Sequence, residues 1–393
     1  MPRTIAAGIH YIGVQDPDLD LFESQYVVPE GMSYNSYLIL DEKIAVLDTA
    51  DARKADEWKH NLAEALDGRE PDYLVVHHME PDHSALIRDA LQAWPGLRLV
   101  ATEKAARMLE QFFDGFDFAG RVLTVREGDV LELGTHALRF FEAPMVHWPE
   151  VMVSYDAASG ILFSADAFGK FGTLDKAFYG EDEADWACEA RRYYFNICGK
   201  YGAPVQQLLR KAATLEIGMI CPLHGPMLRK DLDRYLALYH TWSRYEPESE
   251  GVFIAYASIH GGTAAVAREL AALLKEKGCP KVAVSDLSRD DQAEGVEDAF
   301  RYGRVIFAAA TYDGGLFPPM EAFLHHLRDK AWQKRRVGLI ENGSWAPAAA
   351  RHMRDLLGAM KDIDIVAPTV TIRSRMKAAD RPALEALADA ILQ

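Results

Sequence analysis

The chain has 393 residues, of which 49% are hydrophobic and 26% are charged, and its formal net charge is −16. This length is too great for one ordinary hydrophobic core and predicts two domains. The negative charge argues against a nucleic-acid partner. No apolar run approaches the length of a membrane span, and the first residues lack the apolar core of a signal peptide, so we expect a cytoplasmic protein without a membrane partner.

The first 245 residues predict strands that are covered by helices. Residues 36–40 and 44–48 flank a polar turn and predict a β-hairpin. Further strands are expected at 73–76, at 97–101 and within 121–165, where Gly-containing turns interrupt them. Helices are expected near 53–66, 84–91, 104–113, 183–215 and 228–242. This order of elements fits a sandwich of sheets with helices outside.

Four side chains that can bind a metal ion fall within six residues, between a strand-like run and a helix-like run. They are His78, Glu80, Asp82 and His83. Rigid elements on both sides of such a loop can aim several ligands at one point. Alone, the hexapeptide is weak evidence, because Asp82 can also be interpreted as the N-cap of the following helix.

Three later residues follow or interrupt strand-like runs and can reach the same end of a sheet: His147, Asp166 and His224. Seven ligands are too many for one tetrahedral zinc ion, which takes four. They suit two metal ions bridged by a carboxylate, and imidazole with carboxylate suits iron or manganese at least as well as zinc. The competing interpretation, seven unrelated polar residues, leaves their common position at strand ends unexplained.

The four cysteines form no C-x-x-C pair; they are Cys188, Cys198, Cys221 and Cys279. Their spacing disfavours an iron–sulfur site or an appended rubredoxin module. Disulfides are not expected in a reducing compartment, so we interpret these residues as buried thiols.

The pattern changes after residue 245. Residues 246–250 are charged, include a proline and lack apolar periodicity, which predicts a linker. Residues 251–393 then alternate five strand-like runs with five helix-like runs, which predicts a doubly wound parallel sheet of flavodoxin size. The strands are expected at 252–256, 281–284, 305–309, 336–340 and 363–366.

Three loops of this second domain follow strands at the end where such sheets bind ligands. The first, 258–263, offers hydroxyls, bare backbone amides and a helix N-terminus, which suit a phosphate group. It lacks G-x-x-x-x-G-K-[ST], which disfavours ATP. The other two, 311–319 and 341–347, contain Tyr312 and Trp345, aromatic residues that can stack on a flavin ring or simply cover the core.

Together these motifs resemble those of the flavodiiron proteins, also called A-type flavoproteins. The resemblance lies in H-x-E-x-D-H at 78–83, His-Trp-Pro at 147–149, Phe-Ser-x-Asp-Ala-Phe-Gly at 163–169 and Cys-Pro-x-His-Gly-Pro at 221–226. Loop 258–263 is similar to the flavodoxin phosphate loop. The resemblance implies a metallo-β-lactamase-like αββα sandwich over residues 1–245, the linker 246–250, and a flavodoxin-like doubly wound parallel sheet over residues 251–393.

Glu80 is the residue of the first motif that best distinguishes the flavodiiron pattern from that of the wider β-lactamase-like group. The wider β-lactamase-like group usually has H-x-H-x-D-H, so Glu80 stands where a histidine is usual. A harder oxygen ligand at this place favours iron over zinc.

The resemblance also implies the cofactors, two irons per chain and FMN. His78, Glu80 and His147 would hold one iron, Asp82, His83 and His224 the other, with Asp166 as the bridge; whether His83 is a direct ligand stays open. Tyr193 and Tyr194 are expected either to line a gas pocket or to belong to the core, and His77 to support the site. The residues expected to bind FMN are Ser258, His260, Gly261, Gly262, Thr263, Thr311, Tyr312, Asp313, Gly314, Asn342, Gly343, Ser344 and Trp345.

The activity that the resemblance implies is reduction of O2 to water, of NO to N2O, or both, with electrons relayed through FMN. The electrons are expected from an external donor, either a rubredoxin-like protein or a soluble reduced cofactor. A head-to-tail homodimer, or a dimer of dimers, is implied as well. Two alternatives stay open: a zinc-dependent metallo-β-lactamase-like hydrolase with a flavodoxin module, and an FMN electron carrier.

Overall fold

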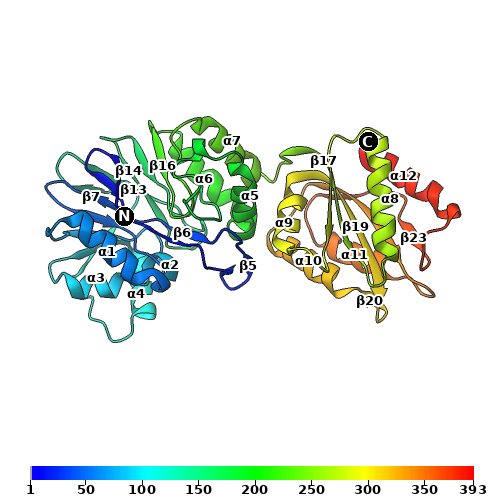
Figure 1. The fold of residues 1–393 in the computed structure, drawn as a ribbon, viewed down its shortest axis with the longest axis horizontal. Helices are drawn as coiled ribbons and strands as arrows, with labels where there is room; N and C mark the ends of the chain where they lie inside the picture. The colour runs from blue at the N-terminus through cyan, green and yellow to red at the C-terminus, as the bar shows by residue number, and fades with distance from the viewer. Residues whose placement is uncertain (1) are drawn as a thin grey trace. The chain divides into compact units, whose positions relative to one another are not determined.

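The computed structural model describes residues 2–393 as two compact units (Figure 1). The first unit comprises the chain up to Tyr194 together with Ala203–Tyr239, and the second comprises Phe195–Gly202 together with His240–Gln393.

Two sheets form the centre of the first unit. The first has the order β1 (Arg3–Ala6), β2 (Ile9–Tyr11), β7 (Tyr37–Ile39), β8 (Ala45–Leu47), β9 (Tyr73–Val75), β10 (Arg98–Thr102), β11 (Val122–Val125). The second has the order β12 (Val130–Glu132), β13 (Ala137–Glu142), β14 (Met152–Asp156), β15 (Ile161–Phe163), β16 (Met219–Cys221). The predicted hairpin is confirmed, because β7 and β8 pair antiparallel.

The two sheets pack against each other through buried apolar side chains. Val75 and Val100 from the first sheet belong to the same core cluster as Phe140 and Phe163 from the second. Two small ribbons lie beside the sheets, β3 (Val14–Asp16) with β6 (Met32–Tyr34), and β4 (Leu21–Phe22) with β5 (Tyr26–Val27). The packing of sheet on sheet confirms the expected sandwich.

Helices cover the outer faces of the sandwich (Figure 1). One group is α1 (Ala55–Leu66), α2 (Pro81–Ser84), α3 (Ile87–Ala93) and α4 (Glu103–Phe112), and the other is α5 (Trp186–Ile197), α6 (Gly202–Ala212) and α7 (Leu232–Ser243). Short 3-10 turns lie at η1 (Ala52–Lys54), η2 (Gly180–Asp182) and η3 (Gly199–Tyr201).

One helix begins earlier than the sequence pattern predicted. We expected a loop up to residue 83 and a helix over 84–91, but α2 begins at Pro81 and a second helix, α3, follows after a break. Proline suits the first position of a helix because its φ is preset and it has no N–H to satisfy. Asp82 and His83 therefore project from a helical turn rather than from a loop.

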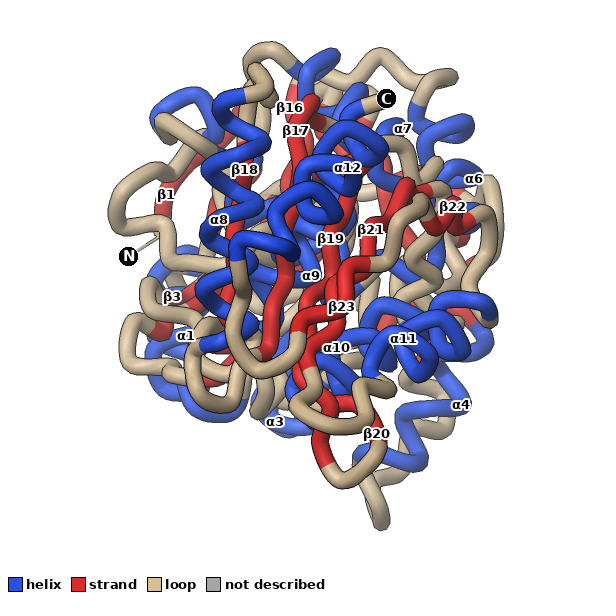
Figure 2. The backbone as a smooth tube through the Cα atoms, turned by 90° about the vertical axis from the view of Figure 1, so that its right-hand side faces the viewer, coloured by secondary structure: helices blue, strands red, loops and turns tan. Residues whose placement is uncertain are grey.

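The second unit is one parallel sheet with helices on both faces. Its strand order is β18 (Val282–Asp286), β17 (Ser249–Ala257), β19 (Tyr302–Tyr312), β21 (Arg335–Asn342) and β22 (Ile363–Ile365), the 2-1-3-4-5 order of flavodoxin-like folds. Figure 2 shows α8 (Gly262–Glu276) and α12 (Arg381–Leu392) lying over the sheet in this view. The remaining helices are α9 (Gln292–Arg301), α10 (Pro318–Asp329), α11 (Ala349–Gly358) and the 3-10 turn η4 (Ala378–Asp380).

The fifth strand is not one run, as the sequence suggested, but two. Both β22 and β23 (Val370–Ile372) pair parallel with β21. Pro368 lies between them and has no N–H to donate to a ladder, which interrupts the strand. A two-residue strand, β20 (Gly315–Leu316), also pairs with the end of β19.

The segment 246–250, predicted to be a linker, overlaps a strand. β17 begins at Ser249, which pairs with Tyr302 of β19. The polar residues Ser249 and Glu250 are the first residues of this strand, where side chains are partly or fully exposed.

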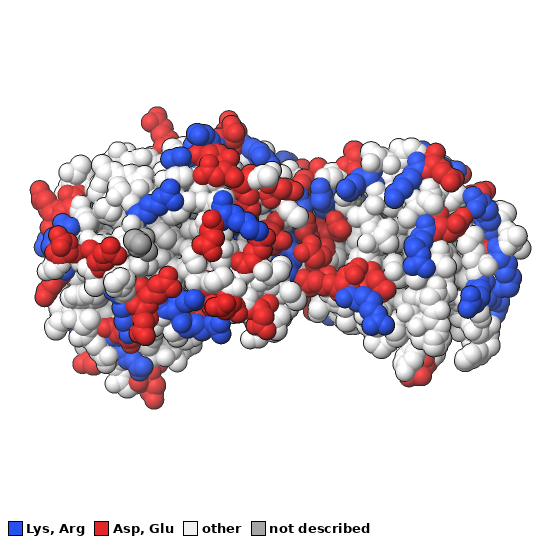
Figure 3. Space-filling model, viewed as in Figure 1, with Lys and Arg blue, Asp and Glu red and all other residues white. Residues whose placement is uncertain are grey.

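None of the helices in residues 2–393 combines the length and hydropathy that a bilayer-spanning segment requires. Acidic and basic side chains are intermixed on the face of the molecule that Figure 3 shows.

Candidate metal centre and flavin pocket

The seven predicted ligand residues come from four chain segments of the first unit and meet in one place. His78 and Glu80 follow β9, and Asp82 and His83 lie in α2. His147 lies between β13 and β14, Asp166 follows β15, and His224 follows β16. Their ligand atoms form two groups, His78 with Glu80, His147 and Asp166, and Asp82 with His83 and His224; within each group the atoms lie within 4.8 Å of one another.

The first group surrounds a common point. Glu80 Oε2 lies 3.2 Å from His78 Nε2 and 3.1 Å from His147 Nε2. Asp166 Oδ2 lies 3.1 Å from His147 Nε2 and 3.5 Å from His78 Nε2. Two ligand atoms that each lie about 2.1 Å from one ion at a right angle are about 3 Å apart, so these spacings suit one ion.

The second group has the same kind of geometry. His83 Nε2 lies 3.0 Å from His224 Nε2 and 3.4 Å from Asp82 Oδ2. His224 Nε2 lies 3.3 Å from Asp82 Oδ2. Two imidazole nitrogens that face each other at this distance and converge with a carboxylate are typical of ligands of one ion.

Asp166 lies between the two groups. Its Oδ2 faces the first group, while its Oδ1 lies 3.3 Å from His83 Nε2 of the second. Both carboxylate oxygens of Asp82 and Oδ1 of Asp166 are buried without a hydrogen-bond donor. Buried carboxylates without donors are costly unless a cation compensates them, so these residues fit a carboxylate-bridged pair of metal ions.

Two of the histidines are oriented by hydrogen bonds from their outer nitrogens. His78 Nδ1 lies 2.8 Å from Glu150 Oε1, and His224 Nδ1 lies 2.7 Å from the carbonyl oxygen of Ser33. A carboxylate and a carbonyl only accept, so both Nδ1 atoms carry the proton and both Nε2 lone pairs remain for a metal. Glu150 was not predicted from the sequence, where its only signal is its position three residues after His147.

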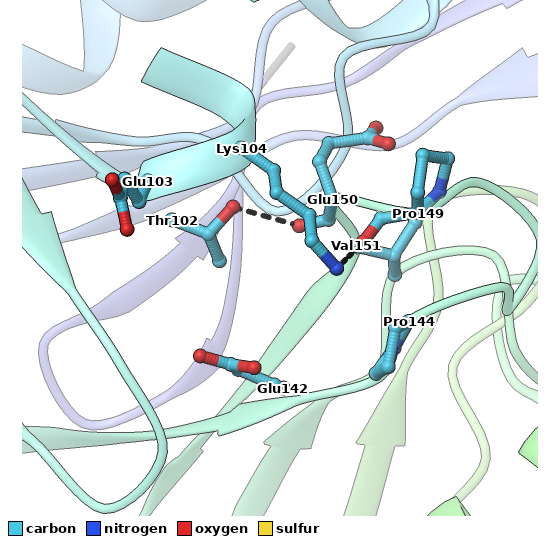
Figure 4. A pocket seen from close by; sticks show the side chains of 8 residues that line it. All are labelled: Thr102, Glu103, Lys104, Glu142, Pro144, Pro149, Glu150 and Val151. Carbon is cyan, nitrogen blue, oxygen red and sulfur yellow. Dashed lines mark hydrogen bonds between the residues drawn. The ribbon is translucent and has the colours of Figure 1, made fainter. Parts of the chain in front are cut away.

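Glu150 is anchored from its other side as well. Its backbone carbonyl accepts a hydrogen bond from Thr102 Oγ1 at 3.0 Å, beside the bond from Lys104 Nζ to the carbonyl of Pro149 (Figure 4). These residues line a cavity of about 220 Å3 that also contains Glu142. In Figure 4 the Glu150 carboxylate points away from Glu142. Its Oε1 is the atom that is hydrogen-bonded to His78 Nδ1.

Left-handed backbone conformations gather beside the ligands. Met145, two residues before His147, has φ +64°, and Ala165, directly before Asp166, has φ +50°. Gly225, directly after His224, has φ +76°, and a Cβ there would come within 2.5 Å of Lys170 Cγ. Such conformations cost energy in residues with a side chain and concentrate where geometry serves a function.

The last ligand loop is joined to the N-terminal part of the chain by Asn35. Its side-chain nitrogen donates to the carbonyl of Pro222 at 2.8 Å and to that of Gly225 at 2.7 Å. Its backbone nitrogen donates to the carbonyl of Leu223. His224 is thus held in place by a residue that precedes it by almost the whole unit.

The charges of the site balance one another. Burial alone would raise the pKa of Asp166, but His78 and His83, with His147, lower this pKa well below its ordinary value. Burial likewise opposes protonation of His147, yet hydrogen bonds to Asp166 and Glu80 raise its pKa to about 9. Without metal, the raised pKa values of His78, His83 and His147 let these imidazoles hold protons against the carboxylates, so metal binding has to release protons.

Three other predicted residues lie near the centre in different ways. Tyr193 is fully buried with its ring centroid 5.7 Å from that of His224, whereas Tyr194 packs against Tyr239 at 5.1 Å. His77 lies in neither metal group and is hydrogen-bonded to Asp48 and Ser154.

The predicted flavin loops of the second unit surround one cavity of about 610 Å3. Twelve of the thirteen predicted residues line it, all except Gly261. Five further lining residues were not predicted from the sequence: Ile259, Ala310, Ala346, Ser374 and Arg375. Ser374 and Arg375 lie in a fourth loop, after β23. This loop was not predicted because β23, the second part of the fifth strand, was not predicted.

The walls of this cavity contact one another closely at Gly262. A Cβ at this position would lie 2.4 Å from the carbonyl oxygen of Ser374 and 3.1 Å from Asn342 Nδ2. Thr311 Oγ1 accepts hydrogen bonds from Ala348 N and Ala349 N, which ties the second loop to the third. Hydroxyls, the start of α8 and a cavity of this size fit FMN.

Comparison with known proteins agrees with both sites. Residues 32–225 match the model of the ODP family of β-lactamases, and residues 253–380 match that of a flavodoxin domain. The chain is 28% identical over 344 residues to the anaerobic nitric oxide reductase flavorubredoxin of Vibrio vulnificus, covering 86% of this chain and 69% of that protein.

Solved structures match over both units. The rubredoxin oxygen:oxidoreductase of Desulfovibrio gigas superposes with a TM-score of 0.93 at 25% identity, covering 100% of this chain and 98% of that one. A variant of the flavo di-iron protein of Thermotoga maritima gives 0.89 at 27% identity, covering 99% and 97%. With its two matched domains, its paired metal groups and its flavin-sized cavity, the chain belongs to the flavodiiron protein family.

Proposed function

We propose that this chain is a di-iron flavoprotein oxidoreductase that reduces O2 to water, NO to N2O, or both. The observation that carries the proposal is Asp166, whose two oxygens face two separate groups of metal ligands. The names of the relatives, a nitric oxide reductase and an oxygen oxidoreductase, support the same class of reaction.

The proposed ligands follow the two groups. His78, Glu80 and His147 would hold one iron, and Asp82 and His224 the other, with Asp166 shared. His83 is included as a ligand of the second iron because its Nε2 converges with that of His224. When bound, such an iron pair supplies positions for a diatomic gas and electrons for its reduction, and FMN supplies one-electron transfer.

The residues of the chain prepare this chemistry. Glu150 and the carbonyl of Ser33 keep the protons of His78 and His224 on the outer nitrogens. Thr263, which is buried at the start of α8, and Ser258 would hold the FMN phosphate. Tyr312 and Trp345 would flank the flavin ring, and the other predicted cavity residues would complete its contacts.

The hydrolase and the electron-carrier alternatives are not favoured. Glu80 occupies the place where the β-lactamase-like group usually has a histidine, and both metal groups are complete. The names of the relatives describe reduction of gases, not hydrolysis.

Single-turnover kinetics test the proposal. The protein, purified anaerobically and fully reduced, is mixed separately with O2 and with NO, while flavin absorbance, O2 consumption and N2O formation are followed. The control is the double variant His78→Ala with His147→Ala, which should keep FMN and lose iron. We expect fast reoxidation with product formation only in the wild type; equal rates with NO in both proteins would exclude the metal centre as the site of reaction.

We further propose a head-to-tail homodimer in which the flavin of one chain serves the metal centre of the other, supplied by an external donor. Large apolar side chains exposed at the flavin cavity support a contact there: Trp345 is 88% exposed, Tyr312 46% and Ile259 39%. The donor, a rubredoxin-like protein or a soluble reduced cofactor, and the cytoplasmic location stay predictions.

Complementation between two inactive variants tests this assembly. One variant, His78→Ala with His147→Ala, lacks iron; the other, Ser258→Ala with Thr263→Val, lacks FMN. If sites are shared between chains, subunit exchange creates one dimer site with both cofactors, and activity returns. An inactive mixture in which mass measurement confirms mixed dimers would exclude the shared arrangement.

A further inference from the structure

His77, next to the metal ligand His78, is hydrogen-bonded at every polar atom. Its backbone nitrogen lies 2.7 Å from Asp48 Oδ1, and its Nδ1 lies 2.6 Å from Asp48 Oδ2. Its Nε2 lies 2.7 Å from Ser154 Oγ, and its carbonyl accepts from Met152 N at 3.1 Å. A side chain held on all sides has a single orientation.

The proton positions in this network follow from its acceptors. A carboxylate only accepts, so Nδ1 of His77 carries a proton and donates to Asp48, while Nε2 is hydrogen-bonded to the hydroxyl of Ser154. Serine, histidine and aspartate are linked in this order in nucleophilic triads as well. Here Ser154, His77 and Asp48 are at most 1% exposed, so no substrate reaches the hydroxyl, and the network is structural.

The network joins the two sheets of the first unit. Asp48 follows β8 and His77 follows β9 in the first sheet, whereas Met152 and Ser154 belong to β14 of the second. The segment that enters β14 also carries Glu150, which holds His78 Nδ1 and the backbone nitrogen of Met79. The neighbouring residues His77 and His78 are thus held by the same segment of the opposite sheet, His77 by β14 itself and His78 by Glu150, two residues before β14.

Asp48 adopts a conformation that serves this contact. Its φ is +55°, in the left-handed region. Its own backbone is fixed there by bonds from Asp48 N to Val75 O and from Ser36 Oγ to Asp48 O, at 2.8 and 2.9 Å. The strained backbone lets one carboxylate accept both from the backbone and from the ring of His77.

We propose that His77 is a positioning residue of the metal centre, which fixes His78 and Glu80 relative to His147 and Asp166 by locking the end of β9 onto β14. The inference rests on the proposed di-iron site and adds the residue that sets its spacing. Because only the first metal group takes ligands directly from this end of β9, loss of the lock should weaken that group more than the group of Asp82, His83 and His224.

The chain offers a matched control network on the same strand. His136 Nδ1 lies 2.8 Å from Asp156 Oδ2, which also accepts from Ser159 Oγ at 2.5 Å. Asp156 is the last residue of β14, two residues after Ser154, and His136 is buried. None of these three residues adjoins a proposed ligand, so His136→Ala removes a buried His–Asp bond without touching the metal centre.

Two variants remove only the side-chain hydrogen bond between His77 and Ser154, and leave the backbone bond from Met152 N to the carbonyl of His77. Ser154→Ala removes the hydroxyl and leaves the His77–Asp48 pair. His77→Asn keeps a donor toward Asp48 but is too short to reach Ser154. The proteins are purified anaerobically as holoproteins, and iron and FMN per chain are measured over a series of chelator concentrations, together with the melting temperature.

We expect the wild type to release its two irons together, and Ser154→Ala and His77→Asn to release one iron at a chelator concentration 10- to 100-fold lower, a range usual for residues that support metal ligands. FMN content should not change, and His136→Ala should melt earlier yet release iron like the wild type. Release curves of Ser154→Ala and His77→Asn that coincide with the wild type would overturn the inference. A wild type without iron would overturn the proposed function, and the inference with it.

Discussion

Glu150 accepts a hydrogen bond from His78, with 2.8 Å between Glu150 Oε1 and His78 Nδ1, and both side chains are buried. The carboxylate fixes the tautomer of the imidazole, so that its Nε2 is directed at the metal site with a free lone pair. Burial alone would raise the pKa of Glu150, but the bond from His78 lowers it, so the carboxylate stays ionised.

The first prediction follows from this pair. Glu150→Gln keeps the shape of the side chain and removes its charge, and we expect iron affinity of the first group to fall roughly 10- to 100-fold. Iron retention against a chelator measures the effect. Glu142→Gln is the control, since Glu142 lines the same cavity in Figure 4 but belongs to neither metal group. Equal retention in both variants would show that Glu150 does not support His78.

A second prediction concerns the identity of the metal. Glu80→His replaces a hard oxygen by a borderline nitrogen between His78 and His147, and we expect the protein to take up zinc at the expense of iron. Metal analysis after growth with both metals present measures the ratio. Unchanged iron content would mean that Glu80 is not a ligand.

Metal removal should destabilise the protein. An ion present at about 1,000 times its dissociation constant stabilises the folded state by about 4 kcal/mol. For a unit of this size that corresponds to a fall of roughly 8–16 °C in melting temperature for each ion removed. Calorimetry before and after anaerobic chelation checks this value, and an unchanged melting temperature with complete iron loss would contradict it.

The flavin cavity gives a fourth prediction. Thr263→Val removes the hydroxyl that we propose to donate to the FMN phosphate. Such a charge-assisted bond is worth about 1.5–3 kcal/mol, so we expect a roughly 10- to 150-fold weaker affinity. Fluorescence titration of the apoprotein with FMN measures it. Thr371→Val, an exposed position of β23 outside the cavity, is the control and should bind like the wild type.

The fifth prediction uses the close contact at Gly262. Gly262→Ala places a methyl group 2.4 Å from the carbonyl oxygen of Ser374, so the loop after β23 has to move and FMN affinity should fall at least tenfold. Gly358→Ala, where an added Cβ meets nothing within 4 Å, should leave FMN binding unchanged. Equal affinity in the two variants would show that the cavity tolerates movement of this wall.

The sequence was informative where the type of side chain and its position at the end of a strand together predict a metal ligand. His78, Glu80, Asp166 and His224 follow strand ends, which made a common site predictable, and β15 and β16, which precede Asp166 and His224, are parallel neighbours. The alternation of strands and helices after residue 250 likewise predicted the doubly wound sheet.

What escaped prediction depends on partners far away in the chain. Glu150 and Asp48 are single carboxylates at strand ends, and nothing local distinguishes them from solvated residues until the opposite sheet supplies His78 or His77. The early start of α2 did have a local signal, Pro81, which the polar character of the hexapeptide outweighed. Pro368 was likewise a local signal, for the interruption of the fifth strand. Because β23 after it was not predicted, the loop of Ser374 and Arg375 was not predicted either.

The contact of Asn35 with the loop of His224 has a consequence for how the protein is made. The bonds from Asn35 to the carbonyls of Pro222 and Gly225 span 187 and 190 residues. A ribosome adds roughly 5–20 residues per second, so the N-terminal strands emerge about 10–40 s before the loop that closes the second metal group. The second metal group therefore cannot be complete until His224 has been made, and in a cell short of iron newly made protein would keep buried carboxylates without their cations.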